Sequence, residues 1–73
     1  MDNFVIICRL RIVRERKGYT QDFVAKSIGI SRNAYSALER GESLPSLPVA
    51  YKLSYFFKCN LRYLFDFKFK KNF

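Results

Sequence analysis

The chain of 73 residues is long enough for one small domain, and at this length folding buries only about 60% of the unfolded chain's surface. Its hydrophobic content of 49% and aromatic content of 18% argue against a disordered chain. The net charge of +8 indicates a polyanionic partner, such as nucleic acid or an anionic membrane surface. The alternative is a soluble domain with a basic face that is simply exposed to water.

The residues present give little support for a metal site, a disulfide or an enzyme active site. The chain has no His, and its two cysteines, Cys8 and Cys59, lie far apart, so we expect no metal site. A disulfide between them is left open, although free thiols in a reducing cytosol fit better. Without a Ser–His or Cys–His pairing or a Gly-rich phosphate loop, the chain is not expected to be an enzyme or to bind a cofactor.

The start of the chain, MDNFVIICRLR, contains a short apolar run but lacks the features of a signal peptide. No stretch of the sequence is long and apolar enough to cross a bilayer. We therefore expect a cytoplasmic protein that does not bind membranes.

Hydrophobic periodicity predicts five short helices, at about 9–17, 21–28, 32–40, 47–58 and 61–65. The last four each follow a residue that can accept the free amides of a first helical turn, namely Thr20, Ser31, Ser46 and Asn60. The first three each end near a glycine that suits a left-handed helix stop, namely Gly18, Gly29 and Gly41.

The sequence FDFKFKK near the C-terminus alternates between apolar and charged residues. Its period of two places Phe65, Phe67 and Phe69 on one face and predicts a short strand. The β-prone stretch at 3–7 can pair with it, because a single strand is not stable alone and needs a partner in this chain or another. The alternative is a frayed basic tail.

The second and third predicted helices are separated only by Gly29, Ile30 and Ser31. A turn of three or four residues that contains Gly makes two short helices cross steeply, and the small side chain of Ala25 allows a close approach. An ordinary corner between two helices has the same spacing, so the turn alone does not define a function.

The stretch YTQDFVAKSIGISRNAYSALERGESLPSL resembles the helix-turn-helix of the lambda-repressor-like, Cro/XRE family of bacterial and phage transcription regulators. The resemblance covers about residues 9–65 and depends on the combination of TQ, GIS, ERG and PSL. It implies an all-α domain of five helices, usually dimeric, whose third helix enters the DNA major groove. Residues 1–73 would then form a single domain, with the motif at about 20–41 and an aromatic, basic tail at 66–73.

The resemblance also implies which residues contact DNA. Arg32 can present two donors to guanine and Asn33 can pair with adenine, although either can instead contact phosphate or be solvated. The Ser36 hydroxyl can serve a base or a phosphate, and Ala37 offers only a methyl group, to thymine. The residues expected to contact phosphate are Gln21, Ser31, Arg40, Ser43 and Ser46.

Other positions that match the family are structural. Arg14 and Glu39 resemble an ion pair that ties the first helix to the end of the third. Tyr35 stands where a β-branched aliphatic residue is common, and we expect its ring in the core and its hydroxyl near the surface. Glu42 departs from the family pattern, because an acid replaces a frequent lysine and weakens the attraction for phosphate.

These observations predict a sequence-specific regulator of transcription, most simply a repressor, that binds an inverted repeat in double-stranded DNA as a homodimer. The residues expected at the dimer interface are Tyr63, Leu64, Phe65, Phe67 and Phe69. One alternative is a protein-interaction module, such as an antitoxin, that also binds DNA and engages a protein partner through its C-terminal tail. A cationic membrane-active protein fits less well, because the hydrophobic residues suit a globular core better than one amphipathic stripe.

Overall fold

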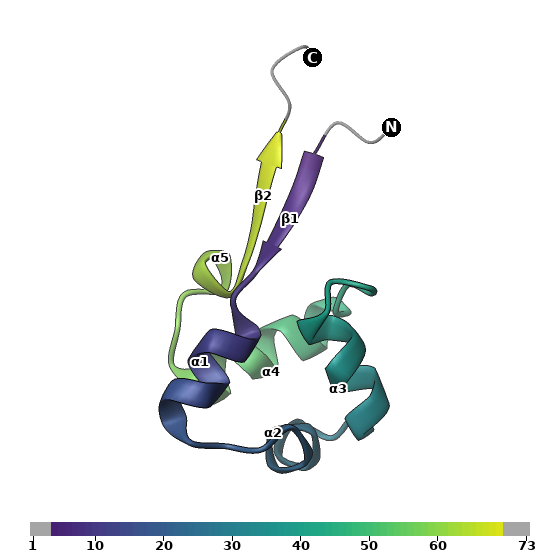
Figure 1. The fold of residues 1–73 in the computed structure, drawn as a ribbon, viewed down its shortest axis with the longest axis vertical. Coiled ribbons are helices and arrows are strands. Elements are labelled where there is room, and N and C mark those ends of the chain that lie inside the picture. The colour runs from purple at the N-terminus through teal and green to yellow at the C-terminus, as the bar shows by residue number, and fades with distance from the viewer. Residues whose placement is uncertain (1–3, 70–73) are drawn as a thin grey trace.

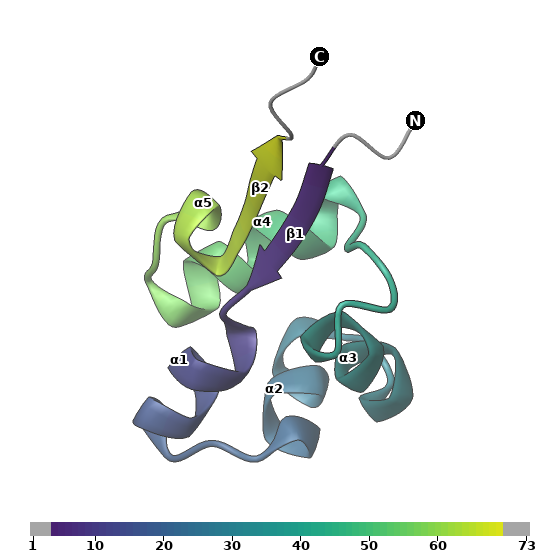
Figure 2. The same ribbon diagram turned by 45° about the horizontal axis from the view of Figure 1, so that its top comes forward.

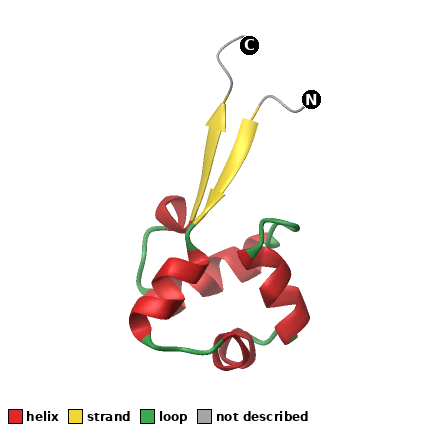
Figure 3. Ribbon diagram, in the orientation of Figure 1, coloured by secondary structure: helices red, strands yellow, loops and turns green. Residues whose placement is uncertain are grey.

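The computed structural model describes the backbone of residues 4–69 and the side chains of residues 5–68. Within that range the chain forms five α-helices and one antiparallel pair of strands (Figures 1 and 3). In chain order these are β1 (Phe4–Cys8), α1 (Leu10–Lys17), α2 (Gln21–Ile28), α3 (Arg32–Glu39), α4 (Leu47–Phe57), α5 (Leu61–Leu64) and β2 (Phe65–Phe69). The predicted five-helix fold is confirmed.

Local signals set the ends of the helices. Each of the four expected N-cap side chains accepts a backbone N–H from the helix that it begins: Thr20 from Phe23, Ser31 from Ala34, Ser46 from Val49 and Asn60 from Arg62. The helix α4 ends differently from α1 and α2, because Lys58 rather than a glycine takes the left-handed conformation, with φ of 54°.

The core lies where the helices meet. Its fully buried large side chains come from α1 to α5 and are Leu10, Val24, Tyr35, Leu53, Phe57 and Leu64. The position of the Tyr35 hydroxyl corrects the prediction, because this group is buried rather than near the surface. The ring points inward from α3 towards Arg14 and Glu39, so its polar end stays within the protein.

The two ends of the described chain lie side by side. The strand β1 pairs with β2 in antiparallel register from Phe4 opposite Phe69 to Cys8 opposite Phe65. The pair rises from the helical body (Figures 1 and 2), so that the molecule measures 41 × 20 × 19 Å. The predicted C-terminal strand therefore finds its partner within the same chain.

The predicted dimer interface needs correction at two positions. Leu64 is 0% exposed and Phe65 is 8% exposed, because α5 and the first residue of β2 close over the core. Tyr63 and Phe67 remain exposed, and the side chain of Phe69 lies outside the described residues. Residues 70–73 of the predicted tail also lie outside the described part of the chain.

Candidate nucleic-acid interface

The helices α2 and α3 meet through a turn of three residues (Figure 2). Gly29 ends α2 with φ of 82°, a backbone conformation that side chains with a Cβ rarely adopt. The amides of Gly29 and Ile30 both donate to the carbonyl oxygen of Ala25, at 2.9 and 3.0 Å. Since Ser31 then caps α3, the backbone groups at the turn are largely satisfied and the crossing of the two helices is fixed locally.

The helix α3 has one buried and one exposed side. Tyr35 and Leu38 face the core, while Arg32 and Asn33 are exposed in the first turn. Ser36 and Ala37 follow one turn later and are half-buried. Residues four apart lie on the same side of a helix, so the residues predicted to contact bases form one continuous face.

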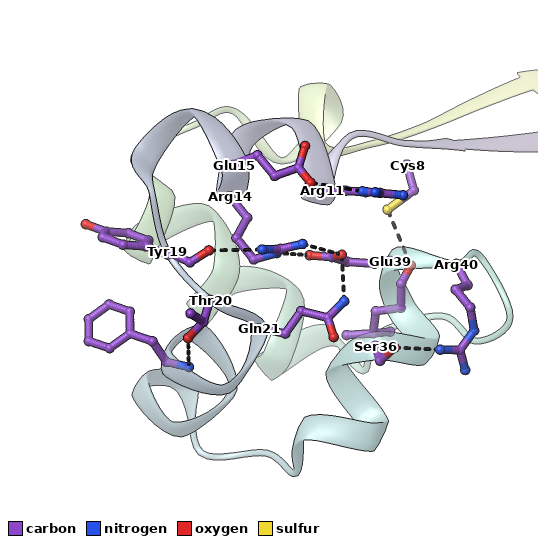
Figure 4. Close-up of polar contacts among 12 residues, drawn as sticks. Cys8, Arg11, Arg14, Glu15, Tyr19, Thr20, Gln21, Ser36, Glu39 and Arg40 are labelled. Carbon is purple, nitrogen blue, oxygen red and sulfur yellow. Dashed lines mark hydrogen bonds and ion pairs between the residues drawn. The ribbon is translucent and has the colours of Figure 1, made fainter.

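Arg40, at the end of α3, is held by other side chains of the same region. Its Nε and Nη2 donate to the two carboxylate oxygens of Glu42, at 2.8 and 3.0 Å. Its Nη1 donates to the Ser36 hydroxyl, whose own O–H is left to act as a donor (Figure 4). The Arg40 guanidinium holds the pKa of the exposed Glu42 carboxyl below its usual range.

A second polar cluster ties α1, α2 and α3 together (Figure 4). Arg14 Nε donates to Glu39 Oε2 at 2.6 Å, and its Nη1 donates to the carbonyl oxygen of Tyr19 at 2.9 Å. Gln21 Nε2 donates to Glu39 Oε1 at 2.9 Å. The resemblance assigned Arg14 and Glu39 to an ion pair, and these two side chains are 12% and 3% exposed. This hydrogen bond uses one of the two N–H groups of the Gln21 amide.

Burial and hydrogen bonding shift the pKa of the Glu39 carboxyl in opposite directions. Burial raises the pKa of its carboxyl, but the hydrogen bonds from Arg14 and Gln21 and the charge of Arg14 outweigh it, so the pKa lies below its usual range. The Tyr35 hydroxyl lies near this carboxylate but has no hydrogen-bond partner of good geometry among the described residues. Burial, with the Glu39 charge, raises the pKa of Tyr35 far above its usual value.

The other residues predicted to contact phosphate lie at helix N-termini or in the loop between α3 and α4. Ser31 and Ser46 accept the amides of Ala34 and Val49 through their hydroxyl oxygens, at 3.0 and 3.3 Å. Both hydroxyls can still donate a hydrogen bond. Ser43 is exposed in the loop. A helix N-terminus favours an anion, so these positions suit phosphate groups.

Cations outnumber carboxylates among the described residues. Every carboxylate of the described residues lies within 4.0 Å of an Arg or Lys nitrogen. The described cations that have no carboxylate partner are Arg9, Arg16, Lys17, Arg32, Lys52, Lys58 and Lys68. Lys52 was not identified from the sequence, because only the fold brings its Nζ to within 3.5 Å of the Ile28 carbonyl oxygen, beside the helix-turn-helix turn.

The described residues contain no group of three His, Cys, Asp or Glu side chains placed to hold a metal ion. None of the described helices has the length and apolar character needed to cross a membrane. Cys8 and Cys59 are half-buried free thiols in the structure. Cys8 Sγ donates to the Leu38 carbonyl oxygen at 3.4 Å, and burial raises the pKa of this thiol.

A steep helix pair with a capped second helix, whose outer side is polar and basic, is the arrangement of a helix-turn-helix DNA-binding domain. A helix-turn-helix family model matches residues 10–64, which is more than half of the chain. The chain therefore belongs to the helix-turn-helix family of transcriptional regulators, as its resemblance to lambda-repressor-like proteins predicts.

Several relatives are similar over most of their length. The chain is 39% identical over 59 residues to an uncharacterised HTH-type transcriptional regulator of Archaeoglobus fulgidus, covering 81% of this chain and 84% of the relative. It is 33% identical over 60 residues to the HTH-type transcriptional regulator MJ0272 of Methanocaldococcus jannaschii, covering 82% and 91%. It is 30% identical over 57 residues to the HTH-type transcriptional regulator YgzD of Bacillus subtilis, covering 78% and 86%.

Proposed function

We propose that the protein is a sequence-specific regulator that binds an inverted repeat in double-stranded DNA as a homodimer in the cytoplasm. Its two α3 helices enter major grooves one helical turn apart, about 34 Å along the DNA. The simplest consequence of occupying a promoter in this way is that transcription is blocked, so the protein acts as a repressor. The observation that carries the proposal is the exposed start of α3, where Arg32 has no carboxylate partner among the described residues.

Base recognition falls to the exposed face of α3. Arg32 donates two hydrogen bonds to guanine, and Asn33 both donates to and accepts from adenine. Ser36 donates its free O–H one turn further along the helix, and the Ala37 methyl group contacts thymine. The buried side of α3 supports this role, because Tyr35 and Leu38 anchor the helix in the core while the outer face stays available.

Phosphate contacts hold α3 in the groove. Ser31 and Ser46 donate from their hydroxyls at the N-termini of α3 and α4, and Gln21 donates its second amide N–H at the start of α2. Ser43 in the loop and Arg40 at the end of α3 contact the backbone beside them. Such contacts fix the register of the protein on DNA, whereas the base contacts supply the sequence preference.

The test is selection of binding sites from a random duplex library at about 0.15 M salt, with wild type, Arg32→Ala and Arg16→Ala. Arg16 is an exposed cation of α1 with no assigned DNA contact, so its variant is a matched control for lost charge. We expect wild type and Arg16→Ala to enrich the same inverted repeat, and Arg32→Ala to lose the preference at one base pair of each half-site. Salt-sensitive binding without enrichment of any sequence would contradict the proposal.

A further inference from the structure

The outer side of α4 carries two strongly exposed tyrosines. Tyr51 is 63% exposed and Tyr55 is 88% exposed, and they lie on the same side of the helix because they are four residues apart. The rings of Tyr19, Phe23 and Phe56 pack against one another, whereas Tyr51 and Tyr55 make no ring contact with another described residue. The core therefore does not depend on these two rings, and each keeps an open face.

Two adjoining hollows border these rings. One, of about 560 Å³, lies between the end of α2 and the end of α4, and the other, of about 450 Å³, lies along α4. Lys52 and Tyr55 line both hollows, and Lys26 and Lys58 line the first. No carboxylate of the described residues lines either one. Lys26 has an exposed partner in Asp22 at 3.3 Å, so the α4 surface, formed by the two tyrosines and the three lysines, keeps a positive charge.

Lys58 takes its place on the α4 surface in a strained backbone conformation. It ends α4 with φ of 54°, whereas α1 and α2 end in the same left-handed conformation at Gly18 and Gly29. This conformation is unfavourable for a residue with a Cβ. A residue that is kept in such a conformation points to a role of its side chain. Here the side chain places a cation at the edge of the first hollow.

We propose that the α4 surface binds single-stranded nucleic acid, a second ligand besides the duplex. Proteins that bind single strands without sequence preference combine aromatic rings, on which bases stack, with cations along the phosphate backbone. Tyr51 and Tyr55 supply two stacking faces about 6 Å apart along the helix axis. The three lysines lie beside them and neutralise phosphates. The rings border hollows rather than a flat apolar face, which favours bases over a lipid surface.

The α4 surface is separate from the base-reading face of α3. None of the residues that line the two hollows belongs to α3, so a duplex on α3 and a single strand on α4 are bound at the same time. Ile28 and Gly29, where α2 meets the turn, line the first hollow, and Lys52 Nζ lies 3.5 Å from the Ile28 carbonyl oxygen. A strand bound here therefore lies against the turn that orients α3.

Fluorescence anisotropy of a labelled oligothymidine of about 12 nucleotides, at about 0.15 M salt, tests the proposal. We expect Tyr55→Ala to weaken binding about fivefold or more, and Tyr55→Phe, which keeps the ring, to retain most of the affinity. Lys58→Gly should weaken binding several-fold and lower the salt slope by about 0.7 log units. The same variant should raise the unfolding temperature, because glycine relieves the left-handed strain. A loss of affinity in a more stable protein cannot come from damage to the fold.

The matched controls are Lys17→Ala, which removes an exposed cation of α1, and Arg32→Ala, which removes the cation assigned to a base. We expect both controls to bind the oligothymidine as tightly as wild type. Unchanged affinity in Tyr55→Ala or Lys58→Gly, or an equal loss in Arg32→Ala, would overturn the proposal. Binding of phosphatidylglycerol vesicles through Tyr55 without binding of the oligothymidine would also overturn it, in favour of a lipid surface. Duplex recognition by α3 is judged separately by the site selection.

Discussion

A single residue, Glu39, joins three helices of the domain through its carboxylate. It accepts hydrogen bonds from Arg14 of α1 and Gln21 of α2 while lying 3% exposed at the end of α3. One carboxylate therefore links three helices from a buried position. Removing one partner of a buried ion pair costs more than the pair contributes, because the remaining charge is left without compensation.

We expect Glu39→Gln to lower the free energy of unfolding by about 3 kcal/mol, because it leaves the Arg14 guanidinium buried without a counter-charge. Urea denaturation followed by circular dichroism measures the loss. DNA affinity should fall only as far as the folded fraction falls, since Glu39 has no assigned contact with DNA. A variant as stable as wild type would contradict this role.

The same carboxylate makes stability depend on pH in a defined direction. The pKa of Glu39 is lower in the folded protein than the ordinary value of 4.5, so its ionisation stabilises the fold above that pH. This stabilisation is lost as pH falls through the folded pKa. Urea denaturation between neutral pH and about pH 3 should show a steeper loss for wild type than for Glu39→Gln, and equal slopes would contradict the assignment.

Glu42 illustrates how a single acid changes a surface suited to phosphate. Its carboxylate occupies two donors of Arg40, the residue assigned to the DNA backbone. We expect Glu42→Gln to strengthen DNA binding several-fold and to steepen the salt dependence by about one log unit for each additional phosphate that Arg40 neutralises. The control is Glu15→Gln, which removes an exposed carboxylate from α1. Unchanged affinity and salt slope for Glu42→Gln would show that releasing Arg40 from Glu42 does not bring it to a phosphate.

At the element scale, the helices were predictable because their ends are encoded locally. Both ends of α2 coincide with the prediction, and one end of each of α1, α3, α4 and α5 differs from it by one residue. Thr20, Ser31, Ser46 and Asn60 supply the caps within a few residues of each helix start. The Tyr35 hydroxyl and the side chains of Leu64 and Phe65 were harder to place, because their burial depends on contacts between distant elements.

The turn between α2 and α3 offers a test at this scale. Gly29 has φ of 82°, and a Cβ at this position meets no atom within 4 Å. The cost of Gly29→Ala therefore comes from backbone strain alone, about 1–2 kcal/mol in the free energy of unfolding. Thermal unfolding of Gly29→Ala measures this loss of stability, and Ser27→Ala, at an exposed neighbouring position in α2, is the control variant. A Gly29→Ala variant with wild-type stability would mean that the turn does not require the left-handed conformation.

At the scale of the whole molecule, the strand pair joins the two ends of the described chain over the helices. The alternation of FDFKFKK predicted the second strand, and the β-prone stretch at 3–7 was a candidate partner for it, with pairing to another chain left open. The structure pairs the two within the same chain, where the Arg9 N–H also donates to the Leu64 carbonyl oxygen and holds the start of α1 beside α5. The same closure buries Leu64 and Phe65, which removes them from the surface expected for a dimer. The exposed face of α3 was predictable because the resemblance supplied its register.

Base reading by Arg32 is tested most directly by a double-mutant cycle between protein and DNA. Affinities are measured for wild type and Arg32→Ala, each with the selected site and with a site changed at the base pair that Arg32→Ala no longer selects. We expect the base change to cost wild type about 1–3 kcal/mol in each half-site and to cost Arg32→Ala almost nothing. Equal costs for the two proteins would place Arg32 on the DNA backbone and contradict base reading by this residue.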